Sequence, residues 1–285
     1  MSVSQNPRYI YRPMSAADVA AAHALSVQLK WPHRLEDWAM LQRVGEGFVV
    51  EDAGRLIGTV FACQQGSYAT IGLVIVSDEY QGQGIGRKLM ELALEACGSA
   101  TAILNATIAG APLYASQGFI EFGHIQQHQG HANAPAPLPL ATGEHCRALD
   151  ADDWPRLLEL ANAGSGLDRT RVLDDLHDAI EQAVAIERDG QLRAFAILRP
   201  FGRGRCIGPV VAENPEQAKH LIATLLAQVP GAFVRIDISA DGGLADWLVT
   251  AGLPQVDSVA QMARGTPPRA VGGVRQFALV TQAIG

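Results

Sequence analysis

Residues 71–76, Ile71-Gly72-Leu73-Val74-Ile75-Val76, are followed closely by Gln81-Gly82-Gln83-Gly84-Ile85-Gly86-Arg87-Lys88. The first run is apolar and of strand length, and the second is a glycine-rich turn. Beyond the turn, apolar residues continue at the spacing of one buried helix face, at Ile85, Leu89, Leu92, Ala93 and Ala96. Glycines let a backbone approach a ligand and aim several N–H groups at one point, and a helix start adds the positive end of its dipole. The stretch therefore predicts a strand, a turn and a helix that together bind a phosphate or pyrophosphate.

Two other phosphate-binding motifs do not fit this turn. A P-loop requires Gly-x-x-x-x-Gly-Lys followed by Ser or Thr, whose hydroxyl binds magnesium, but Gly86 is followed by Arg87, Lys88 and Leu89. A dinucleotide fingerprint requires Gly-x-Gly-x-x-Gly and an acidic residue about 20 residues later. The spacing here is Gly-x-Gly-x-Gly, and the next strand-like run, 102–104, ends in Asn105.

The turn instead fits the pattern Gln/Arg-x-x-Gly-x-Gly/Ala, from Gln81 to Gly86. A second motif lies downstream, Asn105-Ala106-Thr107 and then Pro112-Leu113-Tyr114-Ala115-Ser116-Gln117-Gly118-Phe119. Together these motifs resemble the pyrophosphate loop and the following Tyr-x-x-x-Gly-Phe turn of the GNAT superfamily of N-acetyltransferases. The alternative is an ordinary turn between a strand and a helix, but two motifs in the right order and spacing favour the family.

The resemblance implies that acetyl-coenzyme A is the acyl donor. It assigns cofactor binding to Val74, Ile75, Val76, Gln81, Gly82, Gln83, Gly84, Ile85, Gly86, Arg87 and Asn105. The backbone of residues 74–76 is expected to pair with the pantetheine arm, and an N–H near Val74 to polarise the thioester carbonyl. For Arg87 the alternative is a solvated helix face, and for Asn105 it is a strand-end residue that satisfies local backbone.

Tyr114 is the predicted catalytic residue, a general acid that gives its phenolic proton to the leaving thiolate. The alternative is a core tyrosine that packs beside Leu113 and Phe119. Trp31, His33 and Trp38 fall in the region that lines the acceptor site in the family, and two tryptophans suit a cationic amine. For these three residues the alternative is a helix with inward tryptophans and a surface histidine. The sequence does not identify a general base, and base catalysis through ordered water stays open.

Bulk properties exclude several classes of protein. The chain has 285 residues, 48% of them hydrophobic, and a net charge of −7, which does not favour nucleic acid as a partner. The four cysteines, Cys63, Cys97, Cys146 and Cys206, form no Cys-x-x-Cys pair, and the irregular His124, His128 and His131 have no metal-site spacing. Residues 1–7 lack an apolar signal core, and no apolar run is long enough to span a bilayer. We expect a cytoplasmic protein that binds neither membrane nor metal.

An internal duplication organises the chain on either side of a Pro/Ala-rich linker at residues 131–140. At an offset close to 135, residues 12–18 parallel 147–153, residues 48–58 parallel 183–193, residues 71–74 parallel 207–210, and Tyr114…Phe119 parallels Leu248…Leu253. A repeat of this size indicates duplicated domains rather than a solenoid. We therefore predict an α/β fold with two tandem GNAT-like domains, 1–135 and 136–285, each with a mixed, mostly antiparallel sheet flanked by helices.

The second domain is predicted to have lost the cofactor site. Its strand 207–212 is followed by Glu213-Asn214-Pro215-Glu216, where carboxylates repel a pyrophosphate and a proline removes a donor. At the fixed offset, Gly84 and Gly86 correspond to His220 and Ile222, and Leu248 replaces the tyrosine. The second domain either covers the acceptor pocket of the first or substitutes internally for a dimer partner, so a monomer or a homodimer is expected. Residues 275–282 are expected to complete a sheet as a strand.

These features predict an enzyme that moves an acetyl group from acetyl-coenzyme A to a primary amine of a small molecule by direct attack on the thioester. One alternative is an acetyltransferase for a protein or peptide amine, or for another acyl-coenzyme A. A different class is a non-catalytic coenzyme A-binding regulator. The intact loop together with Tyr114 favours an enzyme, because a regulator needs no acid.

Overall fold

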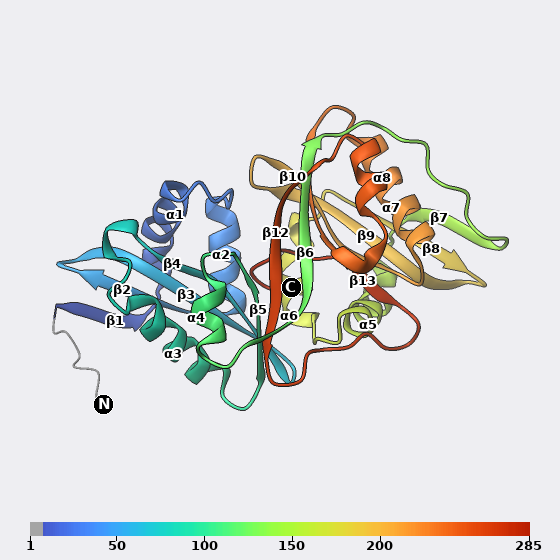
Figure 1. The fold of residues 1–285 in the computed structure, drawn as a ribbon. Helices are drawn as coiled ribbons and strands as arrows, with labels where there is room; N and C mark the ends of the chain where they lie inside the picture. Colours follow the sequence, from blue (N-terminus) through green and yellow to red (C-terminus); the bar gives the residue numbers. More distant parts are fainter. Residues whose placement is uncertain (1–7) are drawn as a thin grey trace.

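A single mixed sheet with helices on both faces runs through the molecule in the computed structural model, which describes residues 8–285 (Figure 1). Its strands are β1 (Tyr9–Pro13), β2 (Glu46–Asp52), β3 (Arg55–Gln65), β4 (Tyr68–Val76), β5 (Thr101–Ala106), β6 (Ile120–His131), β7 (Glu144–Ala148), β8 (Gln182–Arg188), β9 (Gln191–Phe201), β10 (Gly204–Ala212), β11 (Phe233–Ser239), β12 (Gln255–Arg264) and β13 (Arg275–Ala278). The α-helices are α1 (Val19–Gln28), α2 (Leu35–Val44), α3 (Ile85–Cys97), α4 (Ala111–Ala115), α5 (Trp154–Ser165), α6 (Thr170–Leu176), α7 (Pro215–Gln228) and α8 (Ala245–Thr250). The mixed, mostly antiparallel architecture predicted from the sequence is confirmed.

The two halves of the chain are joined by an exchange of strands. The order across the sheet is β1-β2-β3-β4-β5-β12-β6-β11-β13-β10-β9-β8-β7. Strand β12, from the second half, lies between β5 and β6 of the first half, and β6 also pairs with β11. Figure 1 shows β6 and β12 side by side at the centre of the molecule. The two predicted sheets are therefore continuous, with residues 132–143 forming a link without helix or strand between β6 and β7.

Helices cover both faces of the sheet and form cores of different extent. On one face α3 and α4 pack against β2–β5, and α7 packs in the same way against β8–β11. On the other face the apolar sides of α1, α2, α5 and α6 contribute to one cluster that spans both halves of the chain. Arg43 of α2 forms an ion pair with Asp175 of α6 at 2.8 Å across this junction. The shared core and exchanged strands bind the halves into one body.

The duplicated sequence produces duplicated contacts. Arg12 pairs with Asp18 and Glu51, and Arg147 pairs with Asp153 and Glu187 in the same arrangement. In both copies the aspartate also accepts a hydrogen bond from the backbone N–H three residues earlier, at 2.8 Å. These equivalent contacts fix the entry into α1 and α5.

Candidate active site

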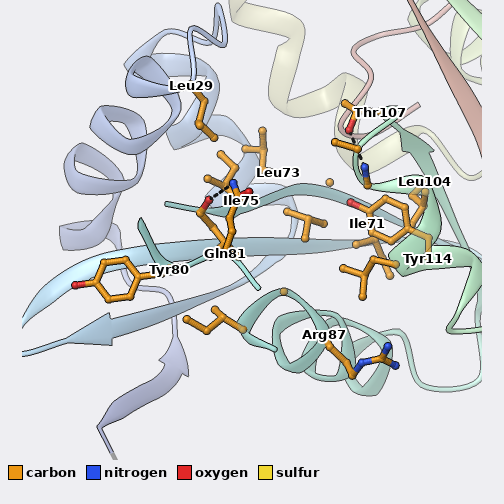
Figure 2. A pocket seen from close by; sticks show the side chains of 18 of the residues that line it. Leu29, Ile71, Leu73, Ile75, Tyr80, Gln81, Arg87, Leu104, Thr107 and Tyr114 are labelled. Atoms are coloured by element: carbon orange, nitrogen blue, oxygen red, sulfur yellow. Dashed lines mark hydrogen bonds between the residues drawn. The ribbon is translucent and has the colours of Figure 1, made fainter. Parts of the chain in front are cut away.

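Strands β4 and β5 separate partway along their length, and the separation opens a cleft. Their parallel pairing runs from Tyr68↔Thr101 to Ile71↔Leu104 and then stops, although β4 continues to Val76. Figure 2 shows side chains that line this cleft. The volume of the cleft is about 510 Å³. Its lining contains Val74, Ile75, Val76, Gln81, Gly82, Gly84, Ile85, Gly86, Arg87, Asn105 and Tyr114. The structure thus brings together all the predicted cofactor residues except Gln83, with the predicted catalytic tyrosine.

A bulge in β4 lies at the point where the strands separate. The register with β3 shifts between Thr59 and Phe61, and Leu73 has a φ of +49°, which an L-residue adopts rarely. The Thr59 hydroxyl donates to the Leu73 carbonyl at 2.8 Å and stabilises this backbone. Strained backbone of this kind is often found at functional sites. Here it interrupts regular pairing beside Val74, the predicted thioester contact.

The glycine loop owes its shape to backbone conformation. Gly82 and Gly84 have φ values of +75° and +81°, and a Cβ at either position would meet no atom within 4 Å. Glycine is therefore needed for the left-handed conformation and not to avoid a clash. Gly84 is the N-cap of α3, and within the described chain no side chain caps the first N–H groups of this helix. Free N–H groups at a helix start form an anion site.

The polar side chains of the loop point in different directions. The Gln81 amide donates to the Val76 carbonyl at 3.2 Å and to Asp78 at 2.9 Å, so it fastens the loop to the end of β4. Gln83 accepts from the Tyr9 hydroxyl at 2.6 Å and does not line the cleft. Arg87 lines the cleft and donates to the Ser116 hydroxyl at 3.2 Å. Arg87 therefore contributes a positive charge to the cleft lining.

Asn105 presents an unpaired acceptor in the wall of the cleft. Its Nδ2 donates to the backbone carbonyl of Gln282 at 2.7 Å. Its Oδ1 is buried and has no hydrogen-bond partner among the described residues. An unpaired buried acceptor is costly and suits a ligand N–H. Sequence reasoning singled out Asn105 but not Gln282, because nothing local links residues so far apart.

Tyr114 stands at the β5 side of the cleft on α4. Its ring rests on Gly110, where a Cβ would lie 2.9 Å from the ring, and it packs edge-on against Phe119 with centroids 6.2 Å apart. The side chain is 8% exposed, and this burial raises the pKa of Tyr114 to about 12. The phenol is therefore protonated at neutral pH, as a proton donor must be.

The three predicted substrate residues have separate environments. Trp31 lines the cleft together with Leu29. His33 does not line it; its ring lies edge-on to Phe201 at 5.6 Å, and burial together with Arg235 lowers its pKa to about 4. Trp38 is fully buried and donates its ring N–H to the Ser26 hydroxyl at 3.1 Å. Of these three residues, only Trp31 is therefore placed to touch a ligand in this cleft. Trp38 instead packs inward from its helix, which was the alternative prediction.

The equivalent position in the second half is filled. Strands β10 and β11 pair in parallel only at Arg205↔Val234 and Cys206↔Arg235. Beyond that point β13 enters between them and pairs with both. The predicted C-terminal strand is thus present, but it is shorter than expected and ends at Ala278.

The glycine loop is missing from the second half. Residues 77–84 separate β4 from α3, whereas only Glu213 and Asn214 separate β10 from α7. The N-cap equivalent to Gly84 is Asn214, and His220 lies inside α7, so the correspondence drawn at a fixed offset was wrong. Glu213 forms an ion pair with Arg188 at 3.0 Å.

A larger hollow of about 660 Å³ lies beside β13. Ser239, Asp241, Arg275 and Gln276 contribute to its polar lining. It contains no residue of the glycine loop, so the smaller cleft remains the better site for an anionic cofactor.

Two general properties concern metals and membranes. Among residues 8–285 there is no group of three or more His, Cys, Asp or Glu side chains that could hold a metal ion. Over the same residues no helix is long and apolar enough to cross a membrane.

Comparison with known proteins agrees with this geometry. Two family models, both described as an acetyltransferase (GNAT) domain, match residues 44–121 and 157–274. The chain is 29% identical over 242 residues to the uncharacterized N-acetyltransferase YitH of Bacillus subtilis, covering 81% of this chain and 82% of the relative. It is 22% identical over 276 residues to holothin acyltransferase of a Pseudoalteromonas species, covering 94% and 92%. The crystal structure of a putative acetyltransferase from Pyrococcus horikoshii shares the fold, with a TM-score of 0.79 at 20% identity over 100% of this chain and 99% of that one.

Both family matches carry the same description, and together they span more than half of the chain. They include the glycine loop and Tyr114 in the first half, and strands β10 and β11 with helix α7 in the second. The chain belongs to the GNAT acetyltransferase family and is an acyltransferase with two GNAT domains in tandem.

Proposed function

We propose that the first GNAT domain transfers an acetyl group from acetyl-coenzyme A to a primary amine of a small molecule. The proposal depends above all on the continuity of the cleft. One opening joins the unpaired edge of β4, the uncapped start of α3 and the side chain of Tyr114. These three features suit, in order, an amide-bearing arm, a pyrophosphate and a leaving thiolate.

The residues of the cleft fit such a donor molecule. A strand edge with free N–H and C=O groups binds an extended amide chain as an added strand would. The start of α3 with left-handed Gly84 binds phosphate oxygens through backbone N–H groups. The Oδ1 of Asn105 is available to accept from an amide N–H. The bound donor would supply an activated acyl thioester.

The catalytic contribution of the protein is positioning, polarisation and a proton. Backbone N–H groups at the bulge beside Val74 would stabilise negative charge on the thioester oxygen. Tyr114 would donate its proton to the thiolate. The titratable side chains that line the described cleft are Tyr80, Arg87 and Tyr114, with no carboxylate or histidine. We therefore propose that the amine loses its proton to ordered water.

Two observations support a small-molecule acceptor. The wall formed by Leu29, Trp31 and Leu73 gives the cleft an apolar side, which is typical of small-ligand sites. One of the relatives is named for the acylation of holothin and not of a protein.

The direct test is thiol release from acetyl-coenzyme A, measured with a panel of small primary amines and with amine-bearing peptides. We expect amine-dependent release well above hydrolysis for at least one small amine, with the acetylated product identified by mass spectrometry. Turnover of peptides alone would contradict the small-molecule acceptor. Turnover with a longer acyl-coenzyme A but not with acetyl-coenzyme A would contradict the donor.

A further inference from the structure

The segment Leu279–Gly285, here called the strap, follows β13 out of the filled slot of the second domain. It folds into a compact hook, in which Gly285 donates to the Thr281 carbonyl at 2.9 Å and accepts from the Val280 N–H at 3.1 Å. Val280 and Ile284 are fully or almost fully buried in the core shared by the two halves. The strap therefore belongs to the interior of the junction.

Buried polar groups fasten the strap to the second domain. The Leu279 N–H donates to the Asp237 carbonyl at 2.9 Å, and Arg199 donates to the Val280 carbonyl at 2.8 Å. The Gln282 side chain donates to the Asp237 carboxylate at 3.0 Å. That carboxylate is 1% exposed and is held in turn by Arg235 at 2.9 Å. Asp237 therefore fixes both the start of the strap and its central glutamine.

The opposite side of the strap lies on the first domain beside the cleft. The Gln282 carbonyl accepts from Asn105 at 2.7 Å, and the Ile284 carbonyl accepts from Gln65 at 3.0 Å. Between them the Ala283 backbone touches Gly72, where a Cβ would lie only 2.5 Å from the Ala283 carbonyl oxygen. Gly72 immediately precedes the bulged Leu73. The strap thus contacts both strands that border the opening of the cleft.

The same strap contacts the equivalent glycine of the second domain. A Cβ on Gly208 of β10 would lie 2.0 Å from the Leu279 carbonyl oxygen. Gly72 and Gly208 occupy corresponding positions: Gly72 borders the register shift of β4, and Gly208 lies within the register shift of β10. The strap therefore bridges the two bulges directly.

The contact with Gln282 decides how the Asn105 amide is oriented. A backbone carbonyl only accepts, so the Asn105 end that faces it must be the NH2 group, and the Oδ1 faces the other way. This Oδ1 belongs to a residue that lines the cleft, and it has no partner in the described chain. No residue of the second domain lines the cleft itself. Any influence of that domain on the cofactor must therefore act through residues such as Asn105.

We propose that Gln282 is a positioning residue: anchored on Asp237, it holds Asn105 so that its Oδ1 accepts a hydrogen bond from an amide N–H of the acyl donor. The second domain, which has no open slot of its own, thereby orders the cofactor site of the first. This inference rests on the proposed function, since it takes acetyl-coenzyme A as the ligand of the cleft.

A double-mutant cycle in the full chain tests the inference by calorimetric titration of acetyl-coenzyme A. Gln282→Met keeps the length of the side chain but removes the hydrogen bond to Asp237. We expect it to weaken acetyl-coenzyme A binding by about fivefold, the scale of one neutral hydrogen bond. In an Asn105→Ala background the same substitution should have no further effect, because the group through which it acts is gone. Gln276→Met on β13 is the matched control, since the described contacts give its side chain no hydrogen bond, and it should bind like the wild type.

The possible outcomes distinguish failure of the role of Gln282 from failure of the proposed function. Absence of binding to the wild type would contradict the proposed function itself. Normal wild-type binding with an unaffected Gln282→Met variant would overturn only the role of the strap. A fivefold loss that persists in the Asn105→Ala background would also overturn it, because Gln282 would then act by another route. Thermal unfolding of each variant verifies that the loss is not general destabilisation.

Discussion

The two halves of this molecule share a slot between parallel strands but use it in opposite ways. In the first half, β4 and β5 pair for four residue pairs and then leave an open cleft. In the second half, β10 and β11 pair for two residue pairs and then receive β13 between them. Both halves have the splayed strands although a strand of the chain itself fills the second slot, so the splaying does not depend on a bound ligand.

Backbone hydrogen bonding explains why the slot must be filled by something. Splayed strands leave N–H and C=O groups without partners, and such groups are costly when buried. In the second half β13 supplies the missing partners. In the first half these groups have no strand partner, and under the proposed function the amide groups of the acyl donor pair with them. The second half also lacks the glycine loop and has the buried Leu248 in place of Tyr114.

The largest expected effect comes from Gly84→Glu, which makes the open slot resemble the closed one. The substitution places an L-residue at a φ of +81° and a carboxylate at the start of α3. We expect acetyl-coenzyme A binding to be lost in calorimetric titration. Gly54→Glu is the control, because Gly54 has a φ of +80° with equally open space in the β2–β3 turn. Retained affinity in Gly84→Glu would show that the loop does not hold the cofactor.

Phe277→Ala attacks the strand that fills the second slot. Phe277 is 1% exposed, and its truncation should lower the free energy of unfolding by about 3–5 kcal/mol, measured in urea. The number of acetyl-coenzyme A sites should not rise, since the glycine loop is still absent. Val256→Ala, at a position 49% exposed on β12, should change stability by less than about 0.5 kcal/mol. A second binding event in Phe277→Ala would mean that β13 alone keeps that domain from binding the cofactor.

Tyr114→Phe should lower kcat by about 100-fold, as expected for removal of a general acid, with unchanged affinity for acetyl-coenzyme A. Because the pKa of Tyr114 is raised to about 12, the wild-type rate should show no decline from its ionisation between pH 7 and 10. Tyr11→Phe, which alters a tyrosine outside the cleft lining, should leave the rate unchanged. An unchanged kcat in Tyr114→Phe would remove this residue from the mechanism.

The smallest effect tests whether the duplicated contacts are energetically equal. Arg12 holds the pKa of Asp18 well below its usual range, and Arg147 lowers the pKa of Asp153. A depressed carboxyl pKa stabilises the fold above the unfolded-state pKa, and this contribution disappears as the pH falls. Asp18→Asn and Asp153→Asn should therefore each cost about 1 kcal/mol at pH 7, and less near pH 3. Unequal losses would show that the two copies have diverged, and losses that persist in acid would show that the carboxylate charge is not their source.

Local pattern in the sequence was sufficient for the strand, the turn and the helix of the cofactor cleft. Periodicity identified β4 and α3, and the positive φ values of Gly82 and Gly84 explain why glycines stand there. The turn after Tyr114 recurs after Leu248, with Gly118 and Gly252 at φ values of +86° and +83°. Such features depend on neighbours in the chain, which a sequence displays directly.

Long-range pairing could not be predicted in the same way. Nothing local indicates that β12 pairs with β5, or that β13 enters the second slot. Alignment of the two halves at a fixed offset could not detect that the loop before α7 is shorter than the loop before α3, and it therefore placed Gly84 opposite His220. Trp38 fitted a substrate wall by its position, and only the packed structure shows that it is fully buried.

One slot of the molecule is open and the other is closed by β13. Calorimetric titration of acetyl-coenzyme A into the full-length wild-type protein tests this difference most directly. The structure predicts one site per chain. Two sites would contradict the closure of the second slot, and no binding would contradict the assignment of the first.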